Sequence, residues 1–345
     1  MRAVLLTGFG GPERLERRDD VPDPVPAAGE VRVRVGAAAV NNTDIWTREG
    51  KYGTSSDPEA STGWRREGMS FPRIQGADVA GRIDRVGAGV AEGRIGERVL
   101  LDPMLYEGGE RELVTTAYLG SERDGGFAEY VTIPAPNAHR IDSPLTDAEL
   151  ASFPTAYSTA LRMLKRARVR KGDTVLVTGA SGGVGSALVQ LCAVLGADAI
   201  AVVGAGKEEQ VRELGARATV RRDSGDLAGA VRAVVTEVDV VADVVAGPMF
   251  ASLLDVLAPL GRYVVAGAIA GPVVGTDLRT VYLRQLELVG SSFGTHEDFT
   301  EVVKYVGDGR LRPLLAGTYP LADLARAQRD FVDKKFFGKL VMEVS

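Results

Sequence analysis

A run of apolar residues that ends in a cluster of glycines constrains this chain more than any other feature. Residues 173–185 read Asp-Thr-Val-Leu-Val-Thr-Gly-Ala-Ser-Gly-Gly-Val-Gly, and a helix-forming stretch, 184–195, follows at once. Gly179 permits a sharp turn out of the strand, Gly182 lets the backbone approach a ligand, and Gly185 lets the helix pack closely on the strand. The N-terminus of the helix then offers N–H groups and the positive end of its dipole to a pyrophosphate.

This strand, turn and helix predict a dinucleotide site. Glycines also serve plain turns, so the prediction depends on the recognisable strand before them and the helix after them. The residues expected to hold the cofactor at this turn are Gly179, Ser181, Gly182, Gly183, Val184 and Gly185.

Composition excludes several other classes of protein. The 345 residues are 45% hydrophobic, enough for two domains, and the formal net charge of −5 gives no general attraction to nucleic acid or to anionic membranes. No apolar run is long enough to span a bilayer, and the first residues lack the basic start of a signal peptide. Cys192 is the only cysteine, which excludes an internal disulfide and a multi-thiolate zinc site. We therefore expect a cytoplasmic protein that acts on a small molecule.

Strands alternate with helices between residues 141 and 294, and this alternation predicts a doubly wound parallel sheet. A helix at 147–168 is expected to lead into the sheet, and a later helix at 250–257 is expected to end at Pro259 and Gly261. The six expected strands lie at 173–178, 200–203, 218–221, 238–245, 263–266 and 286–291. The predicted fold class for this region is α/β, with a six-stranded Rossmann nucleotide-binding domain.

The rest of the chain has the texture of a compact β-domain. Residues 1–140 contain short β-like runs separated by Gly and Pro, and the tail 295–345 is too short for a separate domain, so we expect it to complete the first one. Residues 50–72 are polar and lack periodicity, which predicts a long loop that either caps a large substrate or is an ordinary surface insertion. Its aromatic and basic residues include Tyr52, Trp64, Arg65 and Arg66.

The order and spacing of several motifs resemble the medium-chain dehydrogenase/reductase superfamily, and within it the zinc-independent, quinone oxidoreductase-like branch. The motifs are Val40-Asn41-Asn42-Thr43-Asp44, Gly76-Ala77-Asp78-Val79-Ala80-Gly81, Gly96-Glu97-Arg98-Val99, Gly125-Gly126-Phe127-Ala128-Glu129-Tyr130, Pro154-Thr155-Ala156-Tyr157-Ser158-Thr159-Ala160, Gly290-Ser291 and Gly338-Lys339-Leu340-Val341. The resemblance implies a GroES-like β-domain at 1–140, completed by 295–345, and a Rossmann domain at 141–294.

Two departures from the superfamily's pattern indicate chemistry without a metal. The resemblance places the Cys, His and Cys ligands of a catalytic zinc at Asn41, Ala77 and about Ala151, none of which is a thiol or an imidazole. The segment 102–125, where many relatives hold a structural zinc, has no cysteine. Only two histidines occur, and neither stands at a ligand spacing, so we expect surface or packing roles for both. They are His139 and His296.

The end of the second expected strand favours NADPH over NADH. NAD sites usually place Asp or Glu there to hold the ribose hydroxyls, whereas this chain has Gly204. Lys207 can supply a positive charge to a 2′-phosphate, a contact that the resemblance also implies, and Arg221 or Arg222 can add a second. The alternative is that these cations are solvated surface residues.

Hydride transfer to carbon conjugated with a carbonyl is the reaction that we expect without zinc. Negative charge then develops on the carbonyl oxygen and requires hydrogen-bond donors. The candidate catalytic residues are Asn41, Thr43 and Tyr52. Alternatively, Asn41 and Asn42 serve turn chemistry, Tyr52 packs within the loop, and Asp44 only braces this segment. Further cofactor contacts implied by the resemblance lie at Asn42, Thr155, Ala266, Phe293 and Lys339.

The first functional hypothesis is therefore an NADPH-dependent enone or quinone reductase. Two alternatives stay open: a reductase or reductive cyclase of polyketide-type secondary metabolism, and a non-enzymatic NADPH-binding protein. A methyltransferase also uses a glycine-rich strand and helix, but the paired β-domain argues against it. The resemblance further implies a homodimer in which the apolar strand at 286–291 pairs across a twofold axis.

Overall fold

A computed structural model describes residues 1–54, 57, 59–65 and 68–344. The chain divides into two compact units, Met1–Thr155 with Thr295–Ser345, and Ala156–Gly294. Each unit has its own hydrophobic core. Among the described residues, no helix is both long enough and apolar enough to cross a membrane.

The first unit is built on a seven-stranded sheet. Its order is β10 (Ala138–Arg140), β6 (Arg98–Leu101), β5 (Asp78–Val86), β3 (Glu30–Ala39), β18 (Lys339–Glu343) and β17 (Leu315–Pro320), with β9 (Tyr130–Pro134) also paired to β3. Val31, Val33 and Val35 of β3 are buried on one face of the sheet, as the period of two in a strand requires. The C-terminal strand β18 thus pairs with a strand from the first forty residues.

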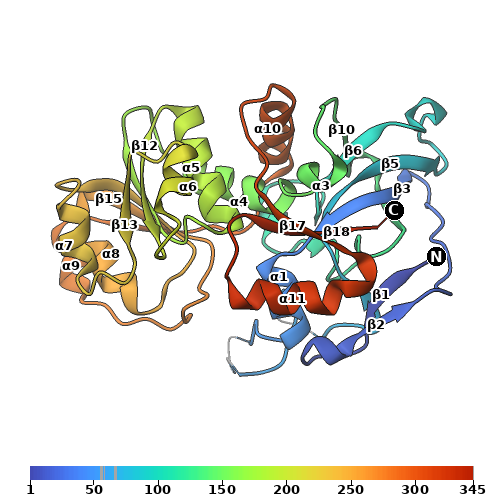
Figure 1. Cartoon of the computed structure of the whole chain (residues 1–345), viewed down its shortest axis with the longest axis horizontal. Coiled ribbons are helices and arrows are strands. Elements are labelled where there is room, and N and C mark those ends of the chain that lie inside the picture. Colours follow the sequence, from blue (N-terminus) through green and yellow to red (C-terminus); the bar gives the residue numbers. More distant parts are fainter. Residues whose placement is uncertain (55–56, 58, 66–67, 345) are drawn as a thin grey trace. The chain divides into compact units, whose positions relative to one another are not determined.

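Smaller elements surround this sheet. The other strands of the unit are β1 (Ala3–Leu6), β2 (Leu15–Arg18) and β4 (Arg73–Ile74), which form a three-stranded sheet, and the pair β7 (Met104–Leu105) and β8 (Ala117–Tyr118). Its helices are α1 (Asn42–Glu49), α2 (Glu110–Leu113), α3 (Asp147–Leu150), α10 (His296–Gly307) and α11 (Leu324–Asp333). α11 packs along β17 and β18 (Figure 1).

The single helix expected at 147–168 is wrong. The structure has two helices there, α3 and α4 (Pro154–Arg166). The break falls at Pro154, because proline has no N–H to continue a helix but fits well in a first turn.

The second unit contains the predicted six-stranded parallel sheet. Its order is β13 (Ala218–Arg221), β12 (Asp198–Val203), β11 (Thr174–Val177), β14 (Val238–Asp243), β15 (Leu257–Val265) and β16 (Glu287–Gly290). In chain order this is 3-2-1-4-5-6, the doubly wound arrangement of Rossmann domains, so the predicted fold class is confirmed. Most of α4 also belongs to this unit, and the helices that follow it are α5 (Gly183–Leu195), α6 (Glu208–Glu213), α7 (Leu227–Arg232), α8 (Phe250–Asp255) and α9 (Leu278–Leu283).

The fifth strand begins earlier than predicted. β15 includes Pro259 and Gly261, which the sequence suggested as the end of a helix. The pairing with β14 moves from Leu257 directly to Arg262, so the residues between them bulge out of the ladder. Proline is tolerated in such a bulge because its missing N–H is not needed there.

Candidate cofactor and catalytic sites

The turn after β11 has the backbone geometry that the glycine cluster predicts. Gly179 has a left-handed φ of +57°, and a Cβ at Gly185 would lie 2.2 Å from the carbonyl oxygen of Gly179. Residue 185 must therefore be glycine, because the first turn of α5 lies directly against the end of the strand. α5 begins at Gly183, and its first N–H groups have no partner within the helix. These N–H groups can bind a pyrophosphate. The other predicted residues of this turn are Ser181, Gly182 and Val184.

Two cationic side chains lie at the end of β12. A Cβ at Gly204 would lie 3.6 Å from Cζ, Nε and Nη2 of Arg222, so this guanidinium covers the strand end where NAD sites usually have an acid. Burial lowers the pKa of Lys207, and the positive charge of Arg222 lowers it further. Arg221 instead forms an exposed ion pair with Asp223 at 2.7 Å. Of the two arginines considered, Arg222 is the one that accompanies Lys207.

Two other predicted cofactor contacts follow β15 and β16. The N–H of Ala266 donates to the carbonyl oxygen of Asp243 at 3.1 Å, and Phe293 is buried with a φ of +51°. The carboxyl ends of parallel strands meet at one edge of a sheet, which is where nucleotides bind in this fold. The turn at 179–185, Gly204 and these two residues therefore share that edge.

Asp243 stabilises the same edge, and sequence analysis did not single it out. Its buried carboxylate accepts hydrogen bonds from the hydroxyls of Thr178 and Tyr263, both at 2.5 Å, and from the N–H groups of Val245 at 2.8 Å and Ala246 at 3.1 Å. These contacts fix the loop after β14. The signal in the sequence is an acid at the end of an otherwise apolar buried strand.

The start of α1 brings together predicted residues of the first unit. Asn41 has an extended φ of −121° and is the N-cap residue of α1, so the local structural role stays open beside the catalytic one. Its Oδ1 accepts a hydrogen bond from the ammonium of Lys339 at 2.5 Å, and that ammonium also lies 2.9 Å from Asp78. Asn42 is the first residue of α1. The cofactor contacts expected for Asn42 and Lys339 stay predictions.

Asp44 braces the segment before α1, as expected. Its carboxylate accepts hydrogen bonds from the N–H of Asn41 at 2.7 Å and from the N–H of Gly76 at 3.3 Å. Burial raises the pKa of Asp44 to about 7, the hydrogen bond from Asn41 opposes this rise, and the negative charge of Asp78 adds to it. This carboxyl therefore couples α1 to the loop before β5.

Thr43 and Tyr52, two predicted catalytic residues, lie in direct contact. Their hydroxyl oxygens are 2.7 Å apart. Burial raises the pKa of Tyr52, so its hydroxyl stays protonated at neutral pH and can donate. The Tyr52 ring packs edge-on against Trp46 and Trp64, with centroid distances of 5.6 and 5.8 Å. Tyr52 and Trp64, two described residues of the loop, are thus connected to α1 through Trp46, whereas Arg66 lies outside the described residues.

Asp78 connects these residues to the start of α4. The N–H of Thr155 donates to its carboxylate at 2.8 Å, and the Thr155 hydroxyl lies 3.3 Å from the hydroxyl of Tyr118. Sequence analysis did not single out Asp78 or Tyr118. The place of Asp78 in a motif beside a zinc-ligand position was the only signal, because its partners come from distant parts of the chain.

Potential metal ligands do not cluster in the part of the chain that the structure describes. No group of three or more His, Cys, Asp or Glu residues there could hold a metal ion. His139 packs on Phe299 at a centroid distance of 4.9 Å, and burial lowers its pKa. His296 lies 2.6 Å from Asp102, whose hydrogen bond raises the pKa of the imidazole. Metal-free chemistry stays a prediction.

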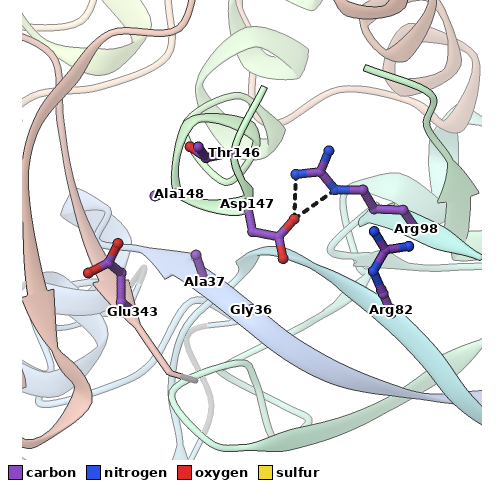
Figure 2. Close-up of a pocket in the computed structure, with 8 residues that line it drawn as sticks. All are labelled: Gly36, Ala37, Arg82, Arg98, Thr146, Asp147, Ala148 and Glu343. Atoms are coloured by element: carbon purple, nitrogen blue, oxygen red, sulfur yellow. Dashed lines mark hydrogen bonds and ion pairs between the residues drawn. The ribbon is translucent and has the colours of Figure 1, made fainter. Parts of the chain in front are cut away.

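A polar cavity of about 570 Å³ also occurs in the first unit (Figure 2). Arg98 and Asp147 form an ion pair of 2.6 Å at its wall. The lining residues are Gly36, Ala37, Arg82, Arg98, Thr146, Asp147, Ala148 and Glu343, and none of them is a predicted site residue.

Comparison with known proteins identifies the family. Residues 27–143 match the family described as alcohol dehydrogenase GroES-like domain, and residues 183–307 match zinc-binding dehydrogenase. An acryloyl-coenzyme A reductase of Metallosphaera sedula is 30% identical over 99% of both chains, and a quinone oxidoreductase of Mus musculus is 29% identical over 96% of this chain and 94% of its own. A solved structure of a putative alcohol dehydrogenase from Sinorhizobium meliloti 1021 is 55% identical, with a TM-score of 0.97 and coverage of 99% and 96% of the two chains.

A two-domain oxidoreductase is the class that this fold and these relatives define. The chain belongs to the medium-chain dehydrogenase/reductase superfamily, as its motifs predicted. Proteins named NAD-dependent alcohol dehydrogenase also match, so likeness alone does not choose between the two nicotinamide cofactors.

Proposed function

We propose that this protein is a zinc-independent, NADPH-dependent reductase of carbon–carbon double bonds conjugated with a carbonyl. The observation that carries this proposal is the pair of hydroxyls at Thr43 and Tyr52 beside Asn41, which stands where zinc enzymes of the superfamily have a thiolate. Hydrogen-bond donors in such a site stabilise a developing oxyanion without a Lewis acid. Acryloyl-CoA and quinones, named for two relatives, both contain a double bond conjugated with a carbonyl.

The chain's residues fit a bound NADPH. The turn at 179–185 offers its N–H groups to the pyrophosphate, and Gly204 leaves the 2′-position of the ribose free of an acid. Lys207 and Arg222 repel each other in the free protein, and a 2′-phosphate would relieve that repulsion.

Bound NADPH would supply a hydride to the β-carbon of the substrate, and the electron pair of the double bond would move to the carbonyl oxygen. Asn41, Thr43 and Tyr52 act as the donors that stabilise this oxygen. Burial raises the pKa of Tyr52, so its hydroxyl stays protonated and donates a hydrogen bond to this oxygen, while water supplies the proton that completes the reduction.

The test is a substrate screen with both cofactors. We expect the purified protein to oxidise NADPH with alkenals, enoyl thioesters or quinones, faster than it oxidises NADH, and to keep this activity after exhaustive chelation. A protein that quenches NADPH fluorescence on binding but turns over none of these substrates is a binding protein, and the proposal then fails. Turnover of a large cyclic enone alone would favour the polyketide-type alternative, in which the loop at 50–72 caps the substrate.

We also propose a homodimer through β16. This edge strand and α9 leave large apolar side chains in water: Leu278 is 67% exposed, Leu283 70% and Leu288 48%. Such an edge normally pairs with another strand. A monomer in sedimentation at micromolar concentration would overturn this assembly. Cytoplasmic location and the absence of nucleic-acid or membrane partners stay predictions from composition.

A further inference from the structure

A buried ion pair lies directly against the candidate catalytic amide. Lys339 is 4% exposed and Asp78 is not exposed at all, and their charged atoms are 2.9 Å apart. The Lys339 ammonium makes a second contact, to Oδ1 of Asn41 at 2.5 Å. A buried charge pair of this kind needs additional hydrogen bonds, and the N–H of Thr155 provides one to Asp78.

This contact decides which end of the Asn41 carboxamide faces the ion pair. An ammonium has only donors, so the amide must present its oxygen to Lys339 and its NH₂ group to the opposite side. Asn41 is 7% exposed, and among the described residues its Nδ2 is a buried atom with no hydrogen-bond partner. A buried N–H group without a partner is costly, which makes it a strong donor for a ligand oxygen.

The backbone around this amide is fixed as well. The N–H of Asn41 donates to Asp44 at 2.7 Å, and the residue directly precedes α1, which also carries Thr43. Backbone and side-chain oxygen are thus both held, and only the NH₂ group is left for a ligand.

We propose that Lys339 and Asp78 are positioning residues that hold the Asn41 carboxamide with its NH₂ group ready to donate to the carbonyl oxygen of the substrate. This inference rests on the proposed reduction of a conjugated carbonyl. Donors that are already oriented before the negative charge develops give the largest catalytic benefit. Without Lys339, the amide can turn over and present its oxygen instead, which would repel the developing enolate.

The kinetic test compares Asn41→Ala, Lys339→Met and the double variant. We expect Asn41→Ala to lower kcat by about 10² to 10³, the range for one oxyanion donor, with the Kd for NADPH nearly unchanged. Lys339→Met should lower kcat by at least tenfold, and Lys339→Arg, which keeps a cationic donor, should restore most of it. Because Lys339 acts through Asn41, Lys339→Met should add little to the loss in the Asn41→Ala background.

Two outcomes of this kinetic comparison would overturn the inference. If Lys339→Met weakens NADPH binding and leaves kcat at saturation unchanged, Lys339 is a cofactor contact. If the two losses multiply in the double variant, the residues act independently. Lys335→Met is the matched control, because this lysine is exposed on its side chain and pairs only loosely, at 3.6 Å, with Asp333.

A second measurement needs no turnover and no cofactor. The side-chain NH₂ signals of Asn41 in the ¹⁵N spectrum are identified by their loss in Asn41→Ala. We expect one sharp pair in the wild type and a doubled or broadened pair in Lys339→Met, whereas an identical pair in both proteins would refute the positioning role.

The removal of Lys339 leaves Asp78 unpaired, so Lys339→Met/Asp78→Asn is the replacement if the single variant does not fold. A wild type with an oriented amide but no turnover of any conjugated substrate would refute the proposed function and leave the positioning role intact.

Discussion

The cofactor edge of the second unit and the start of α1 in the first unit are built in different ways. At the cofactor edge, seven consecutive residues set the geometry, because the left-handed Gly179 and the close approach of Gly185 are properties of the local backbone. At α1, Asn41 depends on Lys339, which is 298 positions further along the chain. The cofactor edge is a backbone site, whose geometry follows from the spacing of glycines in the local sequence. The start of α1 is a side-chain site, whose geometry follows from contacts that form only when distant parts of the chain fold together.

The largest expected effect breaks the backbone site. Gly185→Ala places a Cβ 2.2 Å from the carbonyl oxygen of Gly179, and neither backbone can move without opening the turn. We expect NADPH and NADH binding to weaken more than 100-fold, as measured by fluorescence titration. Gly275→Ala is the control, because nothing lies within 4 Å of its added Cβ. Binding within threefold of the wild type in Gly185→Ala would show that the turn does not hold the cofactor.

The next effect tests the side-chain site. Tyr52→Phe removes the hydroxyl that lies 2.7 Å from Thr43 and keeps the ring that packs on Trp46 and Trp64. We expect kcat to fall about 100-fold, the usual size for the loss of one hydrogen-bond donor to a developing oxyanion, with the Kd for NADPH unchanged. Tyr319→Phe is the matched control, since its hydroxyl donates to Asp330 on a surface remote in sequence from α1. An unchanged kcat in Tyr52→Phe would leave packing as the only role of this tyrosine.

The same contrast explains what the sequence could and could not predict. The turn at 179–185 and the six strands follow from apolar runs and glycine spacing, which are local signals. The break at Pro154 was predictable in principle, because proline starts helices, but the continuous apolar pattern across it favoured one long helix. The bulge at Pro259 depends on the register with β14 and has no local signature.

In the candidate catalytic region, contacts between residues distant in sequence were also not predictable from local patterns. The resemblance suggested Asn41 and Thr43 by their places in the motif at 40–44, and Tyr52 was suggested as an aromatic residue of the loop at 50–72. The sequence could not show that Lys339 fixes the Asn41 amide or that Asp78 joins three elements, because those contacts exist only once β18 pairs with β3. Asp243 is similar, since its partners lie in the turn after β11, on β15 and in the loop after β14.

A smaller effect separates the two cofactors at the second unit's edge. Arg222→Ala removes the guanidinium that lies against Gly204, and Arg221→Ala removes a neighbouring one that pairs with Asp223. We expect Arg222→Ala to weaken NADPH binding about tenfold, the value of one charge-assisted hydrogen bond, and to leave NADH binding unchanged. Arg221→Ala should change neither. Equal losses for both cofactors in Arg222→Ala would remove the argument for NADPH.

The smallest expected effect concerns a second long-range pair in the first unit. His296 and Asp102 are separated by 194 residues in sequence, and their side chains lie 2.6 Å apart. Like Lys339 and Asp78, they form a pair between distant parts of the chain. Unlike that pair, the His296 imidazole is one-third exposed and lies outside the candidate site. The hydrogen bond to Asp102 raises the pKa of His296, and burial opposes the rise. Tyr106 stacks on the ring, and the charges of Glu297 and His139 also act on it.

The sign of the pH dependence follows from that raised pKa. The folded state binds the proton more tightly than the unfolded state, so the pair contributes its full stabilisation below the ordinary imidazole pKa of 6.5 and loses it as pH rises through the folded value.

His296→Gln keeps a hydrogen-bond donor for Asp102 but carries no charge at any pH. We therefore expect this variant to be less stable than the wild type by about 0.5 to 1 kcal/mol at pH 6, the size of a solvent-screened pair, and equally stable at pH 9. Urea midpoints of both proteins across this range measure the difference, and the comparison is repeated in a His139→Gln background, because burial and the charge of His296 both lower the pKa of His139. A constant gap at all pH values would mean that His296 stabilises through packing on Tyr106 alone. A gap that closes, with kcat unaffected, would show that distant side-chain pairs in this unit tune stability without touching catalysis, in contrast to the pair at Asn41.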